Sequence, residues 1–306
     1  AQGDEAFVVL DATSFYAESG GQVGDVGYIR ASNTLFKVVD TQKQGDTFLH
    51  RGELEEGELA VNEKVELSVD AEQRKATALN HSATHLLHAA LKQVLGEHVE
   101  QKGSLVDSQR LRFDFSHSKA VSDDELLAVS DIVNQQIRDN SAVSAVVKSM
   151  DEAKAAGATA LFGEKYGDEV RVLTMGNNDF SIELCGGTHV ERTGDIGLFR
   201  IVSESGIAAG VRRIEALTGE AALADIARVD QQVAKAAVLV KSKPEALTSK
   251  LQQLLEQQKT LEKSFEQLKR EVAGSKSGDL LSNAVEVGGS LVLAMIVDDV
   301  DAKSLR

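Results

Sequence analysis

Two short patterns in this chain place metal-binding side chains at close spacing. One is His81-x-x-x-His85, and the other is Cys185-Gly-Gly-Thr-His189, which contains the only cysteine of the chain. Imidazole nitrogen and thiolate sulfur are the ligands that zinc favours in tetrahedral sites. On a helix, residues four apart share a face, so His81 and His85 can bind the same ion. The sequence therefore predicts one zinc ion held between two distant segments.

Each half of this set also has a simpler explanation. A histidine on a helix is often a surface or core residue, and a lone cysteine is often a small buried apolar group. The occurrence of both patterns in one chain favours the metal. His88 lies three residues beyond His85 on the same helix face and is a rival ligand. The remaining candidates, His50, His98 and His117, have no ligand-like spacing, and we predict that they are structural or exposed.

The ligand set is compatible with two kinds of zinc site. Four protein ligands are typical of a closed structural site, whereas three ligands and a water are typical of a catalytic one. The segment His81-Ser-Ala-Thr-His85 lacks the glutamate that zinc peptidases carry beside the first histidine, which argues against a peptidase. The hydroxyls of Ser82 and Thr84 and the polar run Gln101-Lys-Gly-Ser104 could bind a small polar ligand near the metal.

Helices and strands must bring these residues together. Residues 71–95 are predicted to form a helix, with Asp70 as N-cap and Gly96 at its end. A capping-box pattern at 122–125 begins a second helix, and a third, short helix is expected at 151–157. Strands are expected around Phe113 and Phe115 and at 143–149, 170–175, 180–184, 198–203 and 211–217. This mixture predicts an α+β fold in which residues 76–217 form an α/β sandwich with the zinc site.

Residues 1–75 have the pattern of β structure. Short apolar runs alternate there with glycine, asparagine and aspartate, which favour turns. The segment Glu18-Ser-Gly-Gly-Gln-Val-Gly-Asp-Val-Gly27 is too rich in glycine for a regular element. We predict a small β-barrel subdomain with tight turns.

The pattern changes after residue 217. Apolar residues repeat at alternating spacings of three and four through 218–273, around the only proline, Pro244, with one polar interruption at Gln258. This indicates an antiparallel helical hairpin, which either covers its own seam or serves as a dimer element or RNA-facing arm. Residues 274–283 are predicted to be a linker. Residues 274–306 as a whole are interpreted as a linker and the truncated start of a C-terminal globular domain, with a strand pair at 285–297 and a helix from Asp301.

Composition narrows the class of protein. The chain has 306 residues, a net charge of −15 and one cysteine, which excludes an internal disulfide and suits a reducing cytoplasm. No apolar run reaches the length of a membrane span. Because the chain is acidic, any contact with nucleic acid must rely on local basic patches.

Several motifs together resemble one known family. They are Asn80-His-Ser-Ala-Thr-His-Leu-Leu-His88, Gln101-Lys-Gly-Ser104, Phe162-Gly-Glu-Lys-Tyr-Gly-Asp168, Cys185-Gly-Gly-Thr-His-Val190 and Gly210-Val-Arg-Arg-Ile-Glu215. The set is similar to the editing domain of alanyl-tRNA synthetases and, in part, to free-standing alanyl editing proteins and the threonyl-tRNA synthetase editing domain. The glycine-rich segment 18–25 resembles the alanyl branch. The resemblance is strong over residues 1–217, and nothing in the chain resembles an aminoacylation domain.

The resemblance implies hydrolysis of the ester in Ser-tRNA(Ala) and Gly-tRNA(Ala), within an enzyme that ligates alanine to tRNA(Ala) with ATP. It implies zinc ligands at His81, His85, Cys185 and His189. The amino-acid pocket would be lined by Thr84, Gln101 and Ser104, and Thr84 would recognise the serine hydroxyl. Phosphate contacts are expected from Lys102, Arg212 and Arg213, which could equally be ordinary solvated charges.

Two other functions fit parts of the sequence. One is a non-catalytic tRNA-binding or dimerisation module with a structural zinc, and the other is a free-standing trans-editing protein. The second of these explains residues 1–217 but leaves the helical region unexplained. A homo-oligomer formed through the C-terminal helices is a further expectation, and no membrane partner is expected.

Overall fold

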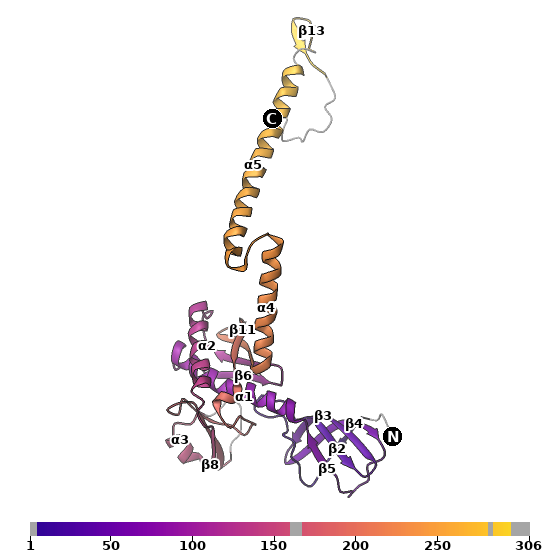
Figure 1. Cartoon of the computed structure of the whole chain (residues 1–306), viewed down its shortest axis with the longest axis vertical. Helices are drawn as coiled ribbons and strands as arrows, with labels where there is room; N and C mark the ends of the chain where they lie inside the picture. Colours follow the sequence, from indigo (N-terminus) through magenta and orange to yellow (C-terminus); the bar gives the residue numbers. More distant parts are fainter. Residues whose placement is uncertain (1–4, 160–166, 281–283, 295–306) are drawn as a thin grey trace. The chain divides into compact units, whose positions relative to one another are not determined.

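The structure is a computed structural model, and it describes residues 5–159, 167–280 and 284–294. The chain divides into two compact units, Ala1–Ile226 and Ala227–Arg306. Figure 1 shows their elements along the chain. None of the described helices combines the length and the apolar character needed to cross a membrane. Most of the motif at 162–168 lies outside the described residues.

The first unit begins with a five-stranded antiparallel sheet, here called the N-terminal sheet. Its order is β1-β4-β3-β2-β5, formed by β1 (Glu5–Val8), β2 (Gly27–Ala31), β3 (Thr34–Gln44), β4 (Thr47–Glu56) and β5 (Glu66–Val69). A small core of Phe15, Ile29, Phe36 and Val38 covers one face. The predicted barrel is wrong, because closure would require β1 and β5 to pair. Each is an edge strand of only four residues, and the sheet stays open.

Helix α1 (Ala71–Leu95) follows the N-terminal sheet and carries the first metal pattern. Its bounds match the prediction. The Asp70 side chain accepts a hydrogen bond from the Gln73 amide at the N-terminus, and Gly96, with a φ of 116°, ends the helix. Thirteen of its residues are buried, among them His81, Thr84, His85 and His88. A helix buried over this much of its surface can hold polar side chains rigidly, provided that each has a partner.

A four-stranded antiparallel sheet packs against α1 and against α2 (Asp123–Arg138). Its order is β11-β12-β7-β6, with β6 (Gln101–Val106), β7 (Leu111–Ser116), β11 (Phe199–Ala208) and β12 (Val211–Thr218). The capping box predicted for α2 is present, between Ser122 and Glu125. The shared core is mainly aliphatic, with Phe113, Phe115 and Phe199 as its largest members. This core fixes the face of α1 that carries the histidines.

A third sheet, of three strands, leads into the segment that carries the other metal pattern. Its order is β10-β9-β8, with β8 (Ser144–Ser149), β9 (Glu169–Met175) and β10 (Ser181–Leu184), and α3 (Met150–Ala155) packs on it. A 3₁₀ helix, η1 (Thr193–Ile196), follows. Strands β8, β9 and β10 lie where the sequence predicts them, whereas β11 continues to Ala208 beyond its expected end and β6 was not predicted as a strand. The α+β class is confirmed.

The second unit contains long helices with little burial. Helix α4 (Gly219–Leu239) begins in the first unit, and the 3₁₀ helix η2 (Pro244–Ala246) leads to α5 (Leu247–Leu280). The antiparallel hairpin over 218–273 stays a prediction. Of the roles left open for it, a seam covered by the hairpin itself is not what the described residues show, because every residue of α5 from Leu251 to Arg270 is exposed. Heptad spacing shows that a seam exists but does not specify which helix covers it.

The predicted linker also differs from the structure. Helix α5 runs through to Leu280, so residues 274–280 are helical, and 281–283 lie outside the described residues. The strand pair expected near residue 285 is present as β13 (Val285–Val287) and β14 (Ser290–Val292). The helix expected from Asp301 lies outside the described residues.

Candidate metal centre

The structure brings the two metal patterns together in the first unit. His81 and His85 come from α1, and Cys185 and His189 come from the loop after β10. One ligand atom from each side chain lies within 4.8 Å of all the others. The Cys185 Sγ atom is 3.5 Å from His81 Nε2 and 3.2 Å from His189 Nε2. Tetrahedral zinc with ligand bonds of about 2.0–2.3 Å requires similar separations, so the set fits this ion.

Each imidazole is held by its other ring nitrogen. The Nδ1 atom of His81 contacts the Gln22 carbonyl oxygen at 2.6 Å, that of His85 contacts the Glu183 carboxylate, and that of His189 contacts the Ser82 hydroxyl at 3.2 Å. Protein zinc sites commonly hold their histidines in this way, so that Nε2 is directed at the metal. His85 Nε2 is buried and has no hydrogen-bond partner among the described residues. A metal ion would satisfy it.

The electrostatics of the site favour a thiolate. Burial by itself would raise the pKa of Cys185, but the neighbouring His81 and His85 rings outweigh it and lower this pKa to about 2. Burial also opposes a charge on His85, yet the Glu183 carboxylate and Cys185 raise the pKa of His85 to about 10. Burial and the neighbouring His81 lower the pKa of His189 to about 3. Thiolate and neutral imidazole are the forms that bind metal, so a proton must leave His85 when an ion binds.

The two glycines between Cys185 and His189 have different surroundings. A Cβ atom on Gly187 would overlap the His81 ring and lie 2.5 Å from its Nδ1, whereas a Cβ on Gly186 would meet nothing within 4 Å. Neither has a positive φ. Gly187 is therefore needed because the loop approaches His81 closely, and not because its backbone takes a conformation that only glycine favours.

His88, the rival ligand, lies beside the centre without joining it. Its Nδ1 contacts Glu183 at 2.7 Å, so the carboxylate bridges His85 and His88, and its ring packs on Phe113. His88 Nε2 is buried without a hydrogen-bond partner in the described part of the chain. Burial alone would raise the pKa of Glu183, but the two rings hold it well below its usual range.

The predicted pocket residues lie on α1, which carries two of the grouped ligands, and on β6, which packs against α1. Thr84 is buried on α1, and its hydroxyl donates to the Asn80 carbonyl at 2.8 Å. Gln101 and Ser104 are half-buried on β6, a strand that contacts α1. Ser82, in contrast, is engaged with the metal loop, because its oxygen also accepts the Val190 amide at 3.1 Å. The structure thus assigns Ser82 to support of the centre.

The three predicted phosphate contacts all have acidic neighbours. Arg212 forms two hydrogen bonds with Glu204, and Arg213 forms two with Asp114. Lys102 forms an ion pair with Glu100 at 2.8 Å. These pairs fix the guanidinium groups along β12 and reduce the charge that they offer to a phosphate.

The chain is similar to known proteins over nearly its whole length. Residues 1–73 match the family described as class II (A) tRNA synthetases. Residues 170–215 match the second additional domain of threonyl and alanyl tRNA synthetases. Alanine–tRNA ligases from Pseudomonas fluorescens and Pseudomonas entomophila are each 57% identical over 304 residues, which is 99% of this chain and 35% of theirs. The ligase of Pseudomonas savastanoi pv. phaseolicola is 56% identical over the same span.

The chain belongs to the alanine–tRNA ligase family. It spans about a third of the length of these relatives, 35%. Both matches agree with the resemblance to alanyl-tRNA synthetases that the sequence motifs indicate. Cys185 and His189 lie inside the match to the second additional domain, whereas His81 and His85 lie outside both matched ranges.

Sequence reasoning missed two residues that support the centre, Glu183 and Gln22. A signal for Glu183 was available, since this acidic residue lies on the predicted strand only two positions before Cys185. No local signal pointed from Gln22 to His81, because the two are 59 positions apart and belong to different elements.

Proposed function

We propose that this region hydrolyses the ester bond of tRNA(Ala) mischarged with serine or glycine. The observation that carries the proposal is the group of three histidines and one cysteine, three of them buried, in a member of the alanine–tRNA ligase family. Cys185 and His189 lie inside the match to the second additional domain. The parent enzyme would ligate alanine to tRNA(Ala) with ATP. Correction is needed because a pocket that accepts alanine cannot exclude glycine and only weakly rejects a side chain with one more hydroxyl.

His81, His85, Cys185 and His189 would hold one zinc ion. When bound, zinc supplies a fixed positive charge that can acidify a water or orient the aminoacyl end of the tRNA. The presence of four protein ligands favours orientation, since such sites are usually closed. An aminoacyl ester is already labile, so correct positioning can supply much of the acceleration.

Thr84 is proposed to distinguish serine from alanine. Its hydroxyl proton is engaged with the Asn80 carbonyl, which leaves the oxygen lone pairs as acceptors. Serine has a side-chain hydroxyl that can donate to this oxygen, and alanine has none. Gln101 and Ser104 would hold the remaining polar groups of the amino acid. We also propose that Lys102, Arg212 and Arg213 contact phosphate groups of the tRNA.

A deacylation assay tests the proposal. The whole chain is incubated with Ser-tRNA(Ala), Gly-tRNA(Ala) and, as the substrate to be spared, Ala-tRNA(Ala). We expect release of serine and glycine, strong loss in Cys185→Ala and Gln101→Ala, and normal rates in Gln109→Ala, a matched change at an exposed loop position. Release of serine by the wild type no faster than in buffer would refute the hydrolase.

A second function is favoured by the completeness of the ligand set. Four protein ligands are also what a structural zinc site has, and the exposed residues of α5 offer a surface for association. The alternative is a non-catalytic tRNA-binding or dimerisation module. It would be supported if the wild type binds zinc and tRNA(Ala) tightly but leaves all three aminoacyl esters intact.

A further inference from the structure

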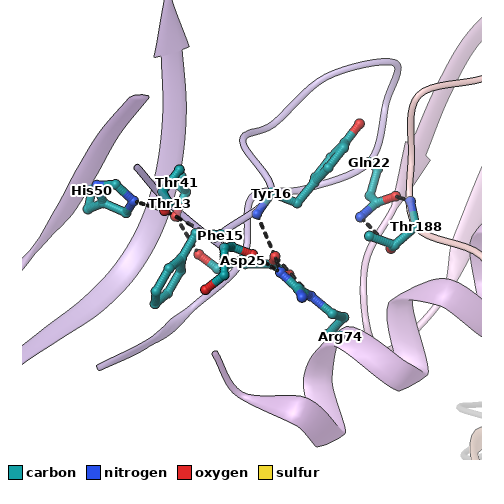
Figure 2. Close-up of polar contacts among 10 residues, drawn as sticks. Thr13, Phe15, Tyr16, Gln22, Asp25, Thr41, His50, Arg74 and Thr188 are labelled. Carbon is teal, nitrogen blue, oxygen red and sulfur yellow. Dashed lines mark hydrogen bonds and ion pairs between the residues drawn. The ribbon is translucent and has the colours of Figure 1, made fainter. Parts of the chain in front are cut away.

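Gln22 lies in the glycine-rich loop (residues 18–26) that leads into β2, yet it reaches the metal centre. Its side chain is completely buried, with an exposed fraction of 0%. The carbonyl oxygen accepts from His81 Nδ1 at 2.6 Å and from the Thr188 amide at 2.9 Å, and Nε2 donates to the Thr188 hydroxyl at 2.8 Å. Figure 2 shows Gln22 against Thr188. One side chain thus contacts a metal-ligand helix and the loop between two further ligands.

These contacts determine which ring nitrogen of His81 carries the proton. A backbone N–H can only donate, so the Gln22 atom beside the Thr188 amide must be the carbonyl oxygen. The same oxygen can only accept, so His81 Nδ1 must carry a hydrogen. The lone pair of a neutral His81 is then on Nε2, the atom 3.5 Å from the Cys185 sulfur. Gln22 therefore selects the tautomer that can bind a metal.

The loop that carries Gln22 is fixed to β6 by backbone hydrogen bonds and to α1 by an ion pair. The Val23 amide donates to the Val106 carbonyl at 3.0 Å, and the Val106 amide donates to the Gly21 carbonyl at 2.7 Å, which extends the edge of β6. Asp25 pairs with Arg74 of α1 and accepts the Tyr16 amide at 2.6 Å (Figure 2). Gly21, with a φ of 84°, allows this docking, because a Cβ there would lie 2.7 Å from the Ser104 carbonyl oxygen.

We propose that Gln22 is a positioning residue for the metal ligand His81, so that docking of the glycine-rich loop and binding of the metal stabilise each other. The inference rests on the zinc site of the proposed function and extends it to the N-terminal sheet. Partners of this kind typically change metal affinity by about 10- to 100-fold when they are removed. The coupling is reciprocal, so the metal must stabilise the docked loop to the same extent.

The first test measures the zinc affinity of the whole chain by competition with a chromogenic chelator. Gln22→Leu removes both polar groups at similar size and should weaken zinc binding by about 10- to 100-fold. Gln22→Glu keeps an acceptor for His81 and Thr188 and should stay near the wild-type value. Gln44→Leu is the control, because Gln44 is exposed at the end of β3 and is neither a metal ligand nor part of the glycine-rich loop.

A second test uses the metal-loaded and metal-free wild type. Removal of zinc should increase amide hydrogen exchange at Val23 and Val106, which join the loop to β6, and should leave Ile29 and Phe36 in the N-terminal sheet unchanged. If Gln22→Leu does not fold, Thr188→Val serves instead. It removes one hydrogen bond to Gln22 and should weaken zinc binding by about two- to tenfold.

The outcomes separate this inference from the proposed function. Wild-type zinc affinity in a folded Gln22→Leu or Thr188→Val variant, or equal exchange at Val23 with and without zinc, would overturn the role of Gln22 and leave the zinc site standing. A wild type that binds no zinc would overturn both. Deacylation without any dependence on zinc would overturn the metal part of the proposed function alone.

Discussion

The metal centre and the apolar seam of α5 (Leu251, Leu254, Leu261, Phe265 and Leu268) are the two most regular patterns in the sequence, and they differ completely in the structure. Three of the four ligands of the centre are buried, and its histidines each have a second partner on Nδ1. The seam is open, with exposed fractions of 71% for Leu261 and 66% for Phe265. The metal ligands are brought together within the described residues, whereas the apolar seam is not covered by any of them.

The difference reflects the kind of interaction that each pattern supports. Metal ligands are directional, and three histidines and a cysteine of one chain can complete a tetrahedral site. Apolar seams are non-directional and are satisfied by any surface of matching shape, whether in the same chain or in another. A ligand pattern therefore predicts its own partners better than a heptad does.

Metal removal should give the largest contrast between the two regions. At free zinc about 1,000-fold above Kd, bound zinc stabilises the folded state by about 4 kcal/mol. Chelation should therefore lower the melting temperature of the first unit and leave the circular dichroism of α5 largely intact. Cys185→Ala should melt at the same temperature with and without chelator. If the wild type melts at the same temperature with and without chelator, a bound metal does not stabilise the first unit.

Gly187→Ala should have the next largest effect. The added methyl overlaps the His81 ring, and overpacking of about 3 kcal/mol corresponds to about a 100-fold loss of zinc affinity. Gly186→Ala adds the same group to open space and should bind zinc normally. Equal affinities of the two variants, measured by chelator competition, would show that the loop does not approach His81 as described.

Glu183→Gln tests whether the centre depends on its supporting carboxylate. The amide cannot hold His85 and His88 through two acceptor oxygens, so zinc affinity should fall by about 30-fold, within the range for such partners. His88→Ala should retain zinc, because His88 is not among the four grouped ligands. Loss of zinc from His88→Ala, measured by elemental analysis, would reinstate His88 as a ligand.

Changes to the seam should have the smallest effect. The double substitution Leu261→Ser and Phe265→Ser alters exposed side chains and should change the free energy of unfolding by less than about 0.5 kcal/mol. Urea denaturation at two protein concentrations measures this value. A larger loss that grows with protein concentration would show that a second copy covers the seam, and the contrast between the two regions would then disappear.

The sequence predicted the bounds of a helix well where capping residues mark its ends. Helix α1 has its predicted bounds because Asp70 caps it and Gly96 ends it, and both effects act within a few residues. The barrel failed because closure depends on whether two strand edges 60 residues apart meet, which no local pattern encodes. The linker failed because a run rich in glycine and serine can continue an established helix for two more turns.

The sequence by itself determined which side chains are able to bind a metal ion, that α1 presents two of them on one face, and that the segment after a strand presents the others. Only the tertiary structure decided what surrounds them. Glu183 joins His85 to His88, and Gln22 comes from the glycine-rich loop before β2 to orient His81. Packing brings buried groups and their hydrogen-bond partners together from distant parts of the sequence. Residue spacing therefore predicts the metal ligands but not the residues that orient them.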